Sequence, residues 1–457
     1  MAKTCSPRQL LLCCLGIFCL LTMFITVALL RHRLQASGSG PVLEAQEPLS
    51  GTSSTAQESV IPAAPKVTHK PTVNRPSLTP SGSNYGLPST KCRTKFAGLF
   101  DELDRSVALQ RELGNVTRAD VDLSWKKDGG ARVMIYNHKL YIIEAKLNSN
   151  GYQRPRLLAT LHQLNRAITA SPFPLPSIEF SFAVDDIPDA SHGHHTIWAF
   201  SRHVSLDNEM WVMPDFGYWS WPLDLVGEYE QIRSEMQENE VTWEDKISKV
   251  LWRGAVKTNK ELRGALMKVT RGKPWADVEQ ITWKSRKDVS DGSAALPIAD
   301  HCKYQFLIHT EGRSYSGRGK YLLNCASIVI THKAEWVEPH SHLFIASGPN
   351  QNVVEVERDF SDLEEKVQEL LQNPDRAKAI VKNSIATFRD RYLTPEAQTC
   401  YWRELFLAWE GISFAPEPWE VDEDGKERIR GVPFQTFVIQ ALDPDRCSWW
   451  KKLTLQC

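Results

Sequence analysis

Residues 303–331 read "KYQFLIHTEGRSYSGRGKYLLNCASIVIT", and this stretch predicts the fold class. A β-rich run at 303–310 leads through a Gly/Ser loop into the start of a helix, and a second β-rich run follows at 326–331. Two strands joined through a helix imply a parallel sheet. The stretch therefore predicts a βαβ unit within an α/β protein.

Similar patterns extend on both sides of this unit. Two β-rich runs at 131–145 are separated by Asn137-His138-Lys139, which predicts a hairpin. Residues 360–393 are strongly helical, with Asn373-Pro374 dividing them in two. We expect an N-terminal α/β half at 91–245 and a C-terminal α/β half at 246–410. A tail follows at 411–457, and we assign it no role.

The N-terminal part of the chain predicts a membrane anchor. Residues 10–30 form an uncharged apolar run of 21 residues, which as a helix would span ~31 Å, enough to cross a bilayer. Because a signal-peptide core is usually shorter, we expect an uncleaved anchor after a cytoplasmic tail at 1–9. Residues 31–90 are rich in Ser, Thr, Pro and Gly and predict a disordered stalk.

Two further features favour a luminal location for the rest of the chain. Asn115-Val116-Thr117 is a glycosylation sequon, and six cysteines follow the anchor, an even number that suits disulfides. We expect a single-pass type II protein of the Golgi or another secretory-pathway membrane. The formal net charge of -1 gives no general attraction to nucleic acid, so we expect no nucleic-acid partner.

The loop inside the βαβ unit is not a nucleotide-binding P-loop. Gly312 and Gly317 have the right separation, but Lys320 is followed by Tyr321, so no hydroxyl is placed to hold magnesium. The loop still precedes a helix, whose free N–H groups bind anions, and Arg318 adds a bidentate phosphate donor. The residues alone leave two interpretations open, which are an anion site and a solvated loop.

Carboxylates and aromatic residues mark two other segments. Asp185 and Asp186 follow a predicted strand, where they suit a general base, a weak metal site or a simple turn cap. Asp215 lies among aromatic residues that suit a sugar ring or a core cluster. Glu335 suits ribose or sugar hydroxyls. The histidine-rich segments lack zinc-site spacing, so we expect no metal site.

Together these pieces resemble glycosyltransferase family 90, which includes fungal capsule-associated xylosyltransferases and Rumi-type protein O-glucosyltransferases. Residues 300–338 look like the core of that family. Four shorter motifs resemble family motifs in the same order, and these are "VDDIP" (184–188), "PDFGYWSWP" (214–222), "WRG" (252–254) and "TCYW" (399–402). The resemblance covers roughly residues 92–410.

The resemblance implies a GT-B-like fold, with two Rossmann-like halves and a cleft between them. It implies an inverting transfer of xylose or glucose from UDP-xylose or UDP-glucose, with no metal or other cofactor. Asp186 would be the general base, and the positively charged Arg253 and Arg318 would neutralise the diphosphate. The other implied donor contacts are Gly254, Ser314, Tyr315, Ser316, Gly317 and Glu335, and the implied sugar or acceptor contacts are Asp185, Asp215, Trp219 and Trp221.

The resemblance also implies that Cys302 pairs with Cys325 and Cys92 with Cys400. Two departures from the Rumi-type pattern, a Gly-Arg pair at the helix start and no KDEL-like tail, favour a carbohydrate or glycolipid acceptor over a folded protein domain. Two alternative functions remain, which are a non-catalytic glycan-binding protein on the same fold and a metal-dependent transferase that uses Asp185 and Asp186.

Overall fold

The computed structural model describes residues 82–147, 152–188, 195–205, 210–222, 226–281 and 295–441. These residues belong to the second of two compact units, Arg75–Cys457. The expected tail at 1–9, the anchor at 10–30 and most of the stalk lie outside the described residues. Within the described ranges, no helix is both long and apolar enough to span a bilayer.

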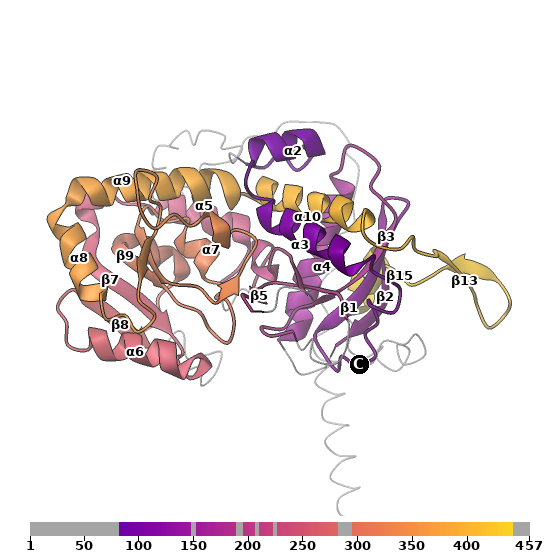
Figure 1. Ribbon diagram of the computed structural model, residues 1–457, viewed down its shortest axis with the longest axis horizontal. Helices are drawn as coiled ribbons and strands as arrows, with labels where there is room; N and C mark the ends of the chain where they lie inside the picture. Colours follow the sequence, from indigo (N-terminus) through magenta and orange to yellow (C-terminus); the bar gives the residue numbers. More distant parts are fainter. Residues whose placement is uncertain are drawn as a thin grey trace, which may run out of the picture. The chain divides into compact units, whose positions relative to one another are not determined.

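A mixed six-stranded sheet forms the first half of the described structure (Figure 1). The β1–β2 hairpin turns at Asn137 and His138, which both have positive φ, as the sequence predicts. β2, β1 and β3 pair antiparallel, while β3, β4 and β6 pair parallel. The strands in sheet order are β15 (Val432–Pro433), β2 (Lys139–Lys146), β1 (Gly130–Tyr136), β3 (Ile178–Ala183), β4 (Ile197–Ala199) and β6 (Met210–Val212).

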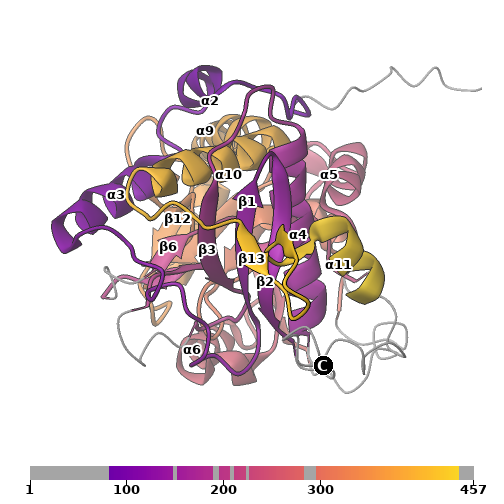
Figure 2. The ribbon, with the colours of Figure 1, turned by 90° about the vertical axis from the view of Figure 1, so that its right-hand side faces the viewer.

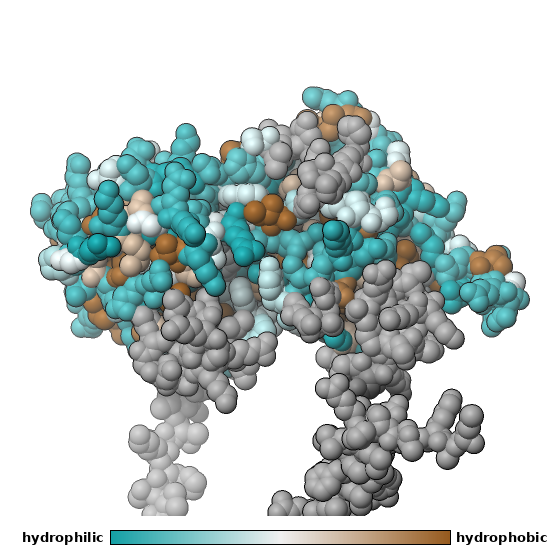
Figure 3. Space-filling view, turned by 90° about the horizontal axis from the view of Figure 1, so that it is seen from below, coloured by the Kyte–Doolittle hydropathy of each residue, from teal (hydrophilic) through white to brown (hydrophobic). Residues whose placement is uncertain are grey.

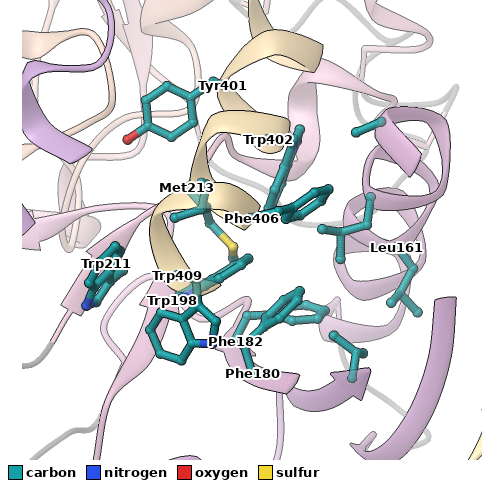
Figure 4. Close-up of a cluster of buried hydrophobic side chains, with 14 of the residues drawn as sticks. Leu161, Phe180, Phe182, Trp198, Trp211, Met213, Tyr401, Trp402, Phe406 and Trp409 are labelled. Carbon is teal, nitrogen blue, oxygen red and sulfur yellow. The ribbon is translucent and has the colours of Figure 1, made fainter. Parts of the chain in front are cut away.

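Aromatic side chains fill the core between this sheet and its helices (Figure 4). The ring centroids of Phe180 and Trp198 are 3.6 Å apart, and the indole N–H of Trp409 donates to the backbone oxygen of Glu179 at 3.0 Å. Helices that pack here include α3 (Asp101–Leu113), α4 (Gln153–Thr169) and α10 (Pro395–Glu410). We expected 246–410 to form the second half, but α10 returns to the first, because its apolar face packs on α4 and β3.

A five-stranded sheet, parallel throughout, forms the second half. The predicted βαβ unit is present as β9 (Tyr304–His309), α7 (Gly319–Leu322) and β10 (Ile328–His332). The other strands are β7 (Ile247–Gly254), β8 (Ala276–Gln280) and β12 (Val354–Val356). The surrounding helices are α5 (Tyr229–Glu238), α6 (Lys260–Thr270), α8 (Leu363–Gln372), α9 (Pro374–Ser384) and the π-helix η6 (Ile385–Tyr392).

Both expected disulfides are present. Cys92 of α2 (Ser89–Lys95) joins Cys400 of α10, and Cys302 joins Cys325 across the βαβ unit. The expected stalk at 31–90 ends earlier than we predicted, because Tyr85 donates to Glu230 at 2.6 Å and Arg403 holds the backbone oxygen of Tyr85 at 2.7 Å.

The segment after residue 410 is partly ordered and contributes to the first sheet. β13 (Trp419–Val421) and β14 (Glu427–Ile429) form a projecting hairpin, and β15 then adds to the edge of β2. Figure 2 shows α11 (Phe434–Ala441) beside α4. The described surface seen from below is mainly hydrophilic (Figure 3). Residues 442–457 lie outside the described residues.

Candidate active site

A cavity of about 160 Å³ brings together side chains from both halves. Each contributing loop follows the carboxyl end of a strand, which is where open α/β sheets bind ligands. Arg156, Asp186, Phe216 and Trp221 come from the first half. The second half contributes Thr258, Arg263, Gly312, Arg313, Tyr315, Ser316 and Gly317.

Asp186, the predicted general base, lies at the wall of this cavity. The Nη1 of Arg156 is 2.7 Å from its Oδ1, and the same nitrogen donates to the backbone oxygen of Val184 at 3.2 Å. The Arg156 guanidinium also lies over the Phe216 ring, 4.8 Å from its centroid. Burial opposes the charge on Arg156, but Asp186, Tyr315 and Tyr152 together outweigh that effect and raise the pKa of the guanidinium. Arg156 therefore fixes the orientation of the carboxylate, and the sequence analysis missed it.

Asp185 does not line the cavity, although we predicted a sugar or acceptor contact. Its two carboxylate oxygens accept hydrogen bonds from Lys126 and Gln153. Burial raises the pKa of Asp185, and the Lys126 ammonium partly opposes that rise. Adjacent residues of a loop point in different directions, so only Asp186 of the pair faces the cavity.

Arginines supply the opposite wall with positive charge. Arg263 is buried and donates to the backbone oxygens of Glu311 and Ala255 and to the Thr258 hydroxyl at 2.9, 3.0 and 2.6 Å. Within the described ranges, neither Arg263 nor Arg318 forms an ion pair with a carboxylate. Burial lowers the pKa of each to about 10, and Arg263 adds to the effect on Arg318. Such desolvated guanidinium groups favour a bound anion.

Arg253, a predicted diphosphate ligand, forms an ion pair with a carboxylate. Its Nη2 lies 2.6 Å from Asp277 Oδ1, and its Nη1 donates to the backbone oxygen of Asp277 at 2.7 Å. Neither Arg253 nor Gly254 lines the cavity, and Gly254 lies against the Trp252 ring. Arg263 lines the cavity, and the predicted diphosphate contact of Arg253 stays a prediction. No sequence pattern indicated a ligand-binding role for Arg263, because an arginine in an amphipathic helix is usually exposed to solvent.

The predicted loop of the βαβ unit does form one side of the cavity. Tyr315, Ser316 and Gly317 line it directly. Ser314 is fully buried, and its hydroxyl has no hydrogen-bond partner among the described residues. Arg318 follows this loop but does not line the cavity, so its predicted diphosphate contact stays a prediction. It donates to the backbone oxygen of Arg253, which joins the loop to β7 at this point.

Asp215 is buried and does not line the cavity, so its predicted sugar or acceptor contact stays a prediction. Its Oδ2 lies 2.6 Å from the Nζ of Lys320, and its Oδ1 accepts from the backbone N–H of Gly217 at 2.7 Å. One face of the Trp219 ring is covered by His162, which stacks on it with ring centroids 5.0 Å apart. Trp221 is the one of the two predicted tryptophans that lines the cavity.

Glu335 belongs to a charged group beside β11 (Trp336–Val337). Its Oε2 lies 3.0 Å from Arg358, which also pairs with the buried Glu311 at 3.1 Å. Glu311 in turn accepts from the backbone N–H groups of Glu335 and Trp336. Glu335 is half exposed and does not line the cavity, so its predicted contact with ribose stays a prediction.

Two other predictions concern the surface and metal binding. Asn115 of the sequon is exposed, and the Thr117 hydroxyl beside it donates to Asp120 at 2.8 Å. Across the described part of the chain, no group of three or more potential ligands is arranged to hold a metal ion. His192 and His194 of the histidine-rich segment lie outside the described residues.

Comparison with known proteins identifies the kind of chain that builds this site. The sequence model described as glycosyl transferase family 90 matches residues 89–413. Protein O-glucosyltransferase 1 of Rattus norvegicus is 30% identical over 251 residues, 51% of this chain and 62% of that protein. Protein O-glucosyltransferase 3 of the same species is 26% identical over 275 residues, 58% of this chain and 52% of that protein.

A third relative is the O-glucosyltransferase rumi homolog of Anopheles gambiae. It is 25% identical over 301 residues, which cover 61% of this chain and 70% of that protein. The chain spans about 62% of the length of the first curated relatives that it matches.

Proposed function

This chain belongs to glycosyl transferase family 90, and on that premise we propose that it moves xylose or glucose from UDP-xylose or UDP-glucose to a carbohydrate, glycolipid or glycoprotein acceptor. It is a glycosyltransferase, and it therefore has a sugar donor and an acceptor as substrates. The transfer inverts the anomeric carbon and uses no metal ion or other cofactor. A GT-B-like arrangement of the two halves is part of the proposal.

The observation that carries the proposal is one carboxylate facing arginines across a shared cavity. Asp186 lies on the wall formed by the first half, and Arg263 and Arg313 lie on the wall formed by the second. A base and an anion site on opposite walls are what direct displacement at a sugar carbon requires, because the nucleophile and the leaving group lie on opposite sides of C1.

The proposed mechanism is a single displacement. Asp186 accepts the proton of an acceptor hydroxyl while that oxygen forms a bond to C1 of the donor sugar. The C1–O bond to the diphosphate breaks, and its electron pair leaves with UDP. Arg263 and Arg318 stabilise the charge that develops there, since buried and prearranged cations stabilise a developing negative charge.

Arg156 prepares the base for this step. It holds one oxygen of Asp186 at 2.7 Å, and the other oxygen is the proposed proton acceptor. This contact keeps Asp186 at the wall of the cavity, where we propose that the acceptor hydroxyl binds.

Two disulfides indicate folding in an oxidising compartment such as the secretory pathway. We propose a Golgi or related secretory-pathway membrane as the location, with the body luminal and residues 10–30 as a single type II anchor. The apolar length of that segment supports the proposal.

The full-length chain, purified in detergent, tests the function. UDP-xylose and UDP-glucose are offered with UDP-galactose as a control donor, against a panel of glycans, glycolipids and glycoproteins, with and without EDTA. We expect transfer from one of the first two donors, unchanged by EDTA. Transfer that EDTA abolishes would support a metal-dependent enzyme, and glycan binding without turnover would support the non-catalytic alternative.

A further inference from the structure

We propose that Lys320 and Asp215 are positioning residues that hold the two walls of the active-site cavity in register, and that Lys320 does not contact the donor. This inference rests on the proposed function, because it takes the cavity to be the donor site. Lys320 follows the glycines of the βαβ loop, where its position in the sequence would suggest a phosphate ligand.

The contacts of Lys320 join the two halves. Its Nζ lies 2.6 Å from Oδ2 of Asp215, which follows β6 of the first sheet. The same nitrogen donates at 2.6 Å to the backbone oxygen of Gly317, in the loop that lines the cavity. The Lys320 side chain is fully buried, and its ammonium is already engaged by both partners, so it cannot reach a ligand without breaking this arrangement.

Asp215 is fixed from its own side as well. Its Oδ1 accepts from the backbone N–H of Gly217 at 2.7 Å, which places the start of the short helix η1 (Phe216–Tyr218). The hydroxyl of Tyr321, in the same helix as Lys320, donates to the backbone oxygen of Gly217 at 3.1 Å. Both sides of the contact therefore lead directly to cavity-lining residues, Phe216 on one wall and Gly317 on the other.

Gly217 shows how closely these groups approach. A methyl group at its Cα would lie 2.7 Å from the indole nitrogen of Trp221 and 2.9 Å from the Nζ of Lys320. Both distances are far below van der Waals contact, so any side chain here would displace Trp221 or Lys320. Trp221 lines the cavity, and the absence of a side chain at Gly217 is thus required for its position.

A nearby carboxyl does not compete with Asp215 for the ammonium. Burial raises the pKa of Glu338 to about 8, against the opposing effect of Lys320 and with a further rise from Asp215. Glu338 is therefore mostly protonated at neutral pH, which leaves Asp215 as the counter-ion of Lys320. Removal of either partner of a buried carboxylate–ammonium pair strongly destabilises the folded protein, because the remaining buried charge is uncompensated.

Three variants of the full-length chain test the inference: Lys320→Met, Asp215→Asn and Gly217→Ala. Gly217→Ala changes no charge and displaces Trp221, Lys320 or Asp215 by volume alone. Two control variants accompany them. Gly264→Ala introduces a methyl group into open space on α6, and Val367→Ala lowers stability from the core of the second half, away from the cavity.

The readouts are the Kd for UDP, the donor KM and kcat, all measured at 15 °C, and the unfolding temperature. We expect the three test variants to lower kcat/KM for the donor by about tenfold to a hundredfold, since small displacements of reacting groups have effects of that size. Val367→Ala should lower the unfolding temperature without a change in KM, and Gly264→Ala should behave like the wild type.

Two results would overturn these ideas separately. If the wild type binds UDP and transfers sugar while the folded test variants keep Kd and KM within twofold of it, the positioning role is wrong. A wild type that neither binds UDP nor transfers sugar overturns the proposed function, and the positioning role with it. If Lys320→Met or Asp215→Asn does not fold, Gly217→Ala decides by the same criteria.

Discussion

Arg263 carries a positive charge in a buried position, which is unfavourable without a negative partner. Its guanidinium is held by two backbone oxygens and one hydroxyl, and burial lowers its pKa to about 10. A diphosphate would supply the negative charge that these partners lack. Burial also lowers the pKa of Arg318 to about 10, and this arginine follows the cavity-lining loop without lining the cavity itself. We therefore expect the phosphate to bind on the side of the cavity formed by Arg263.

Arg263→Ala tests that assignment. Charge-assisted hydrogen bonds contribute about 1.5–3 kcal/mol each, so we expect the Kd for UDP to rise by roughly tenfold to a hundredfold. Isothermal titration calorimetry measures it directly. Lys268→Ala, an exposed residue of the same helix, is the matched control. Equal UDP affinity in both variants would show that Arg263 is not a phosphate ligand.

Glu338 gives a pH-dependent prediction at the same scale. Burial raises its pKa from 4.5 to about 8, so the folded state holds a proton that the unfolded state releases between these values. Stability should therefore fall as pH rises from about 4.5 to about 8. Glu338→Gln removes this dependence, and its unfolding temperature should exceed that of the wild type at pH 8 but not at pH 4.5.

The control for this measurement is Glu355→Gln, at an exposed carboxylate. Thermal unfolding followed by circular dichroism across that pH range gives both curves. Wild-type and Glu338→Gln curves that stay parallel from pH 4.5 to pH 8 would contradict the raised pKa.

Residue roles were the hardest part of the site to predict. The family resemblance implied roles for Asp186 and for the loop at 315–317, and the structure places both at the cavity. The same resemblance implied substrate contacts for Arg253 and Asp215, which stay predictions. The structure shows that each forms an ion pair, with Asp277 and Lys320 respectively. Such partners are distant in sequence, so no local pattern could reveal them.

Among the elements, those with strictly local causes were predicted well. The β9–α7–β10 unit, the hairpin at Asn137 and the division of 360–393 at Asn373 all follow from periodicity, turn residues and proline. The return of α10 to the first sheet and the addition of β15 to β2 depend on packing between distant segments. Sequence patterns carry no information on such pairings.

The segment after residue 413, where the family match ends, supports the wall of the active site through α11. Phe434 contacts His162 edge-on, with centroids 5.1 Å apart, and His162 stacks on Trp219. Trp219 is two residues from the cavity-lining Trp221. Through these contacts, α11 packs against the segment that contributes Trp221 to the cavity.

Phe434→Ala should lower stability by about 3–5 kcal/mol, the usual range when a buried aromatic side chain is truncated. Ile439→Ala in the same helix is the control, because Ile439 is 70% exposed and its loss should have little effect. Chemical denaturation followed by tryptophan fluorescence measures both. Similar losses for the two variants would mean that α11 does not pack as described.

At the scale of the whole molecule, the two halves are joined at several points and the chemistry is shared between them. The Lys320–Asp215 pair, the β5–β11 pairing (β5 is Arg202–His203) and the returning helix α10 all link segments of one half to the other. The proposed base belongs to the first half and the phosphate-binding arginines to the second. Neither half alone would contain the complete site.

We propose that Asp186 deprotonates the acceptor, and Asp186→Asn in the full-length chain tests that role. The substitution keeps the shape of the side chain and removes its basicity. The measurement is the single-turnover rate of sugar transfer at saturating donor, together with the Kd for UDP. We predict a rate lower by about 10²–10⁴-fold with UDP affinity nearly unchanged. A transfer rate equal to that of the wild type would contradict the account.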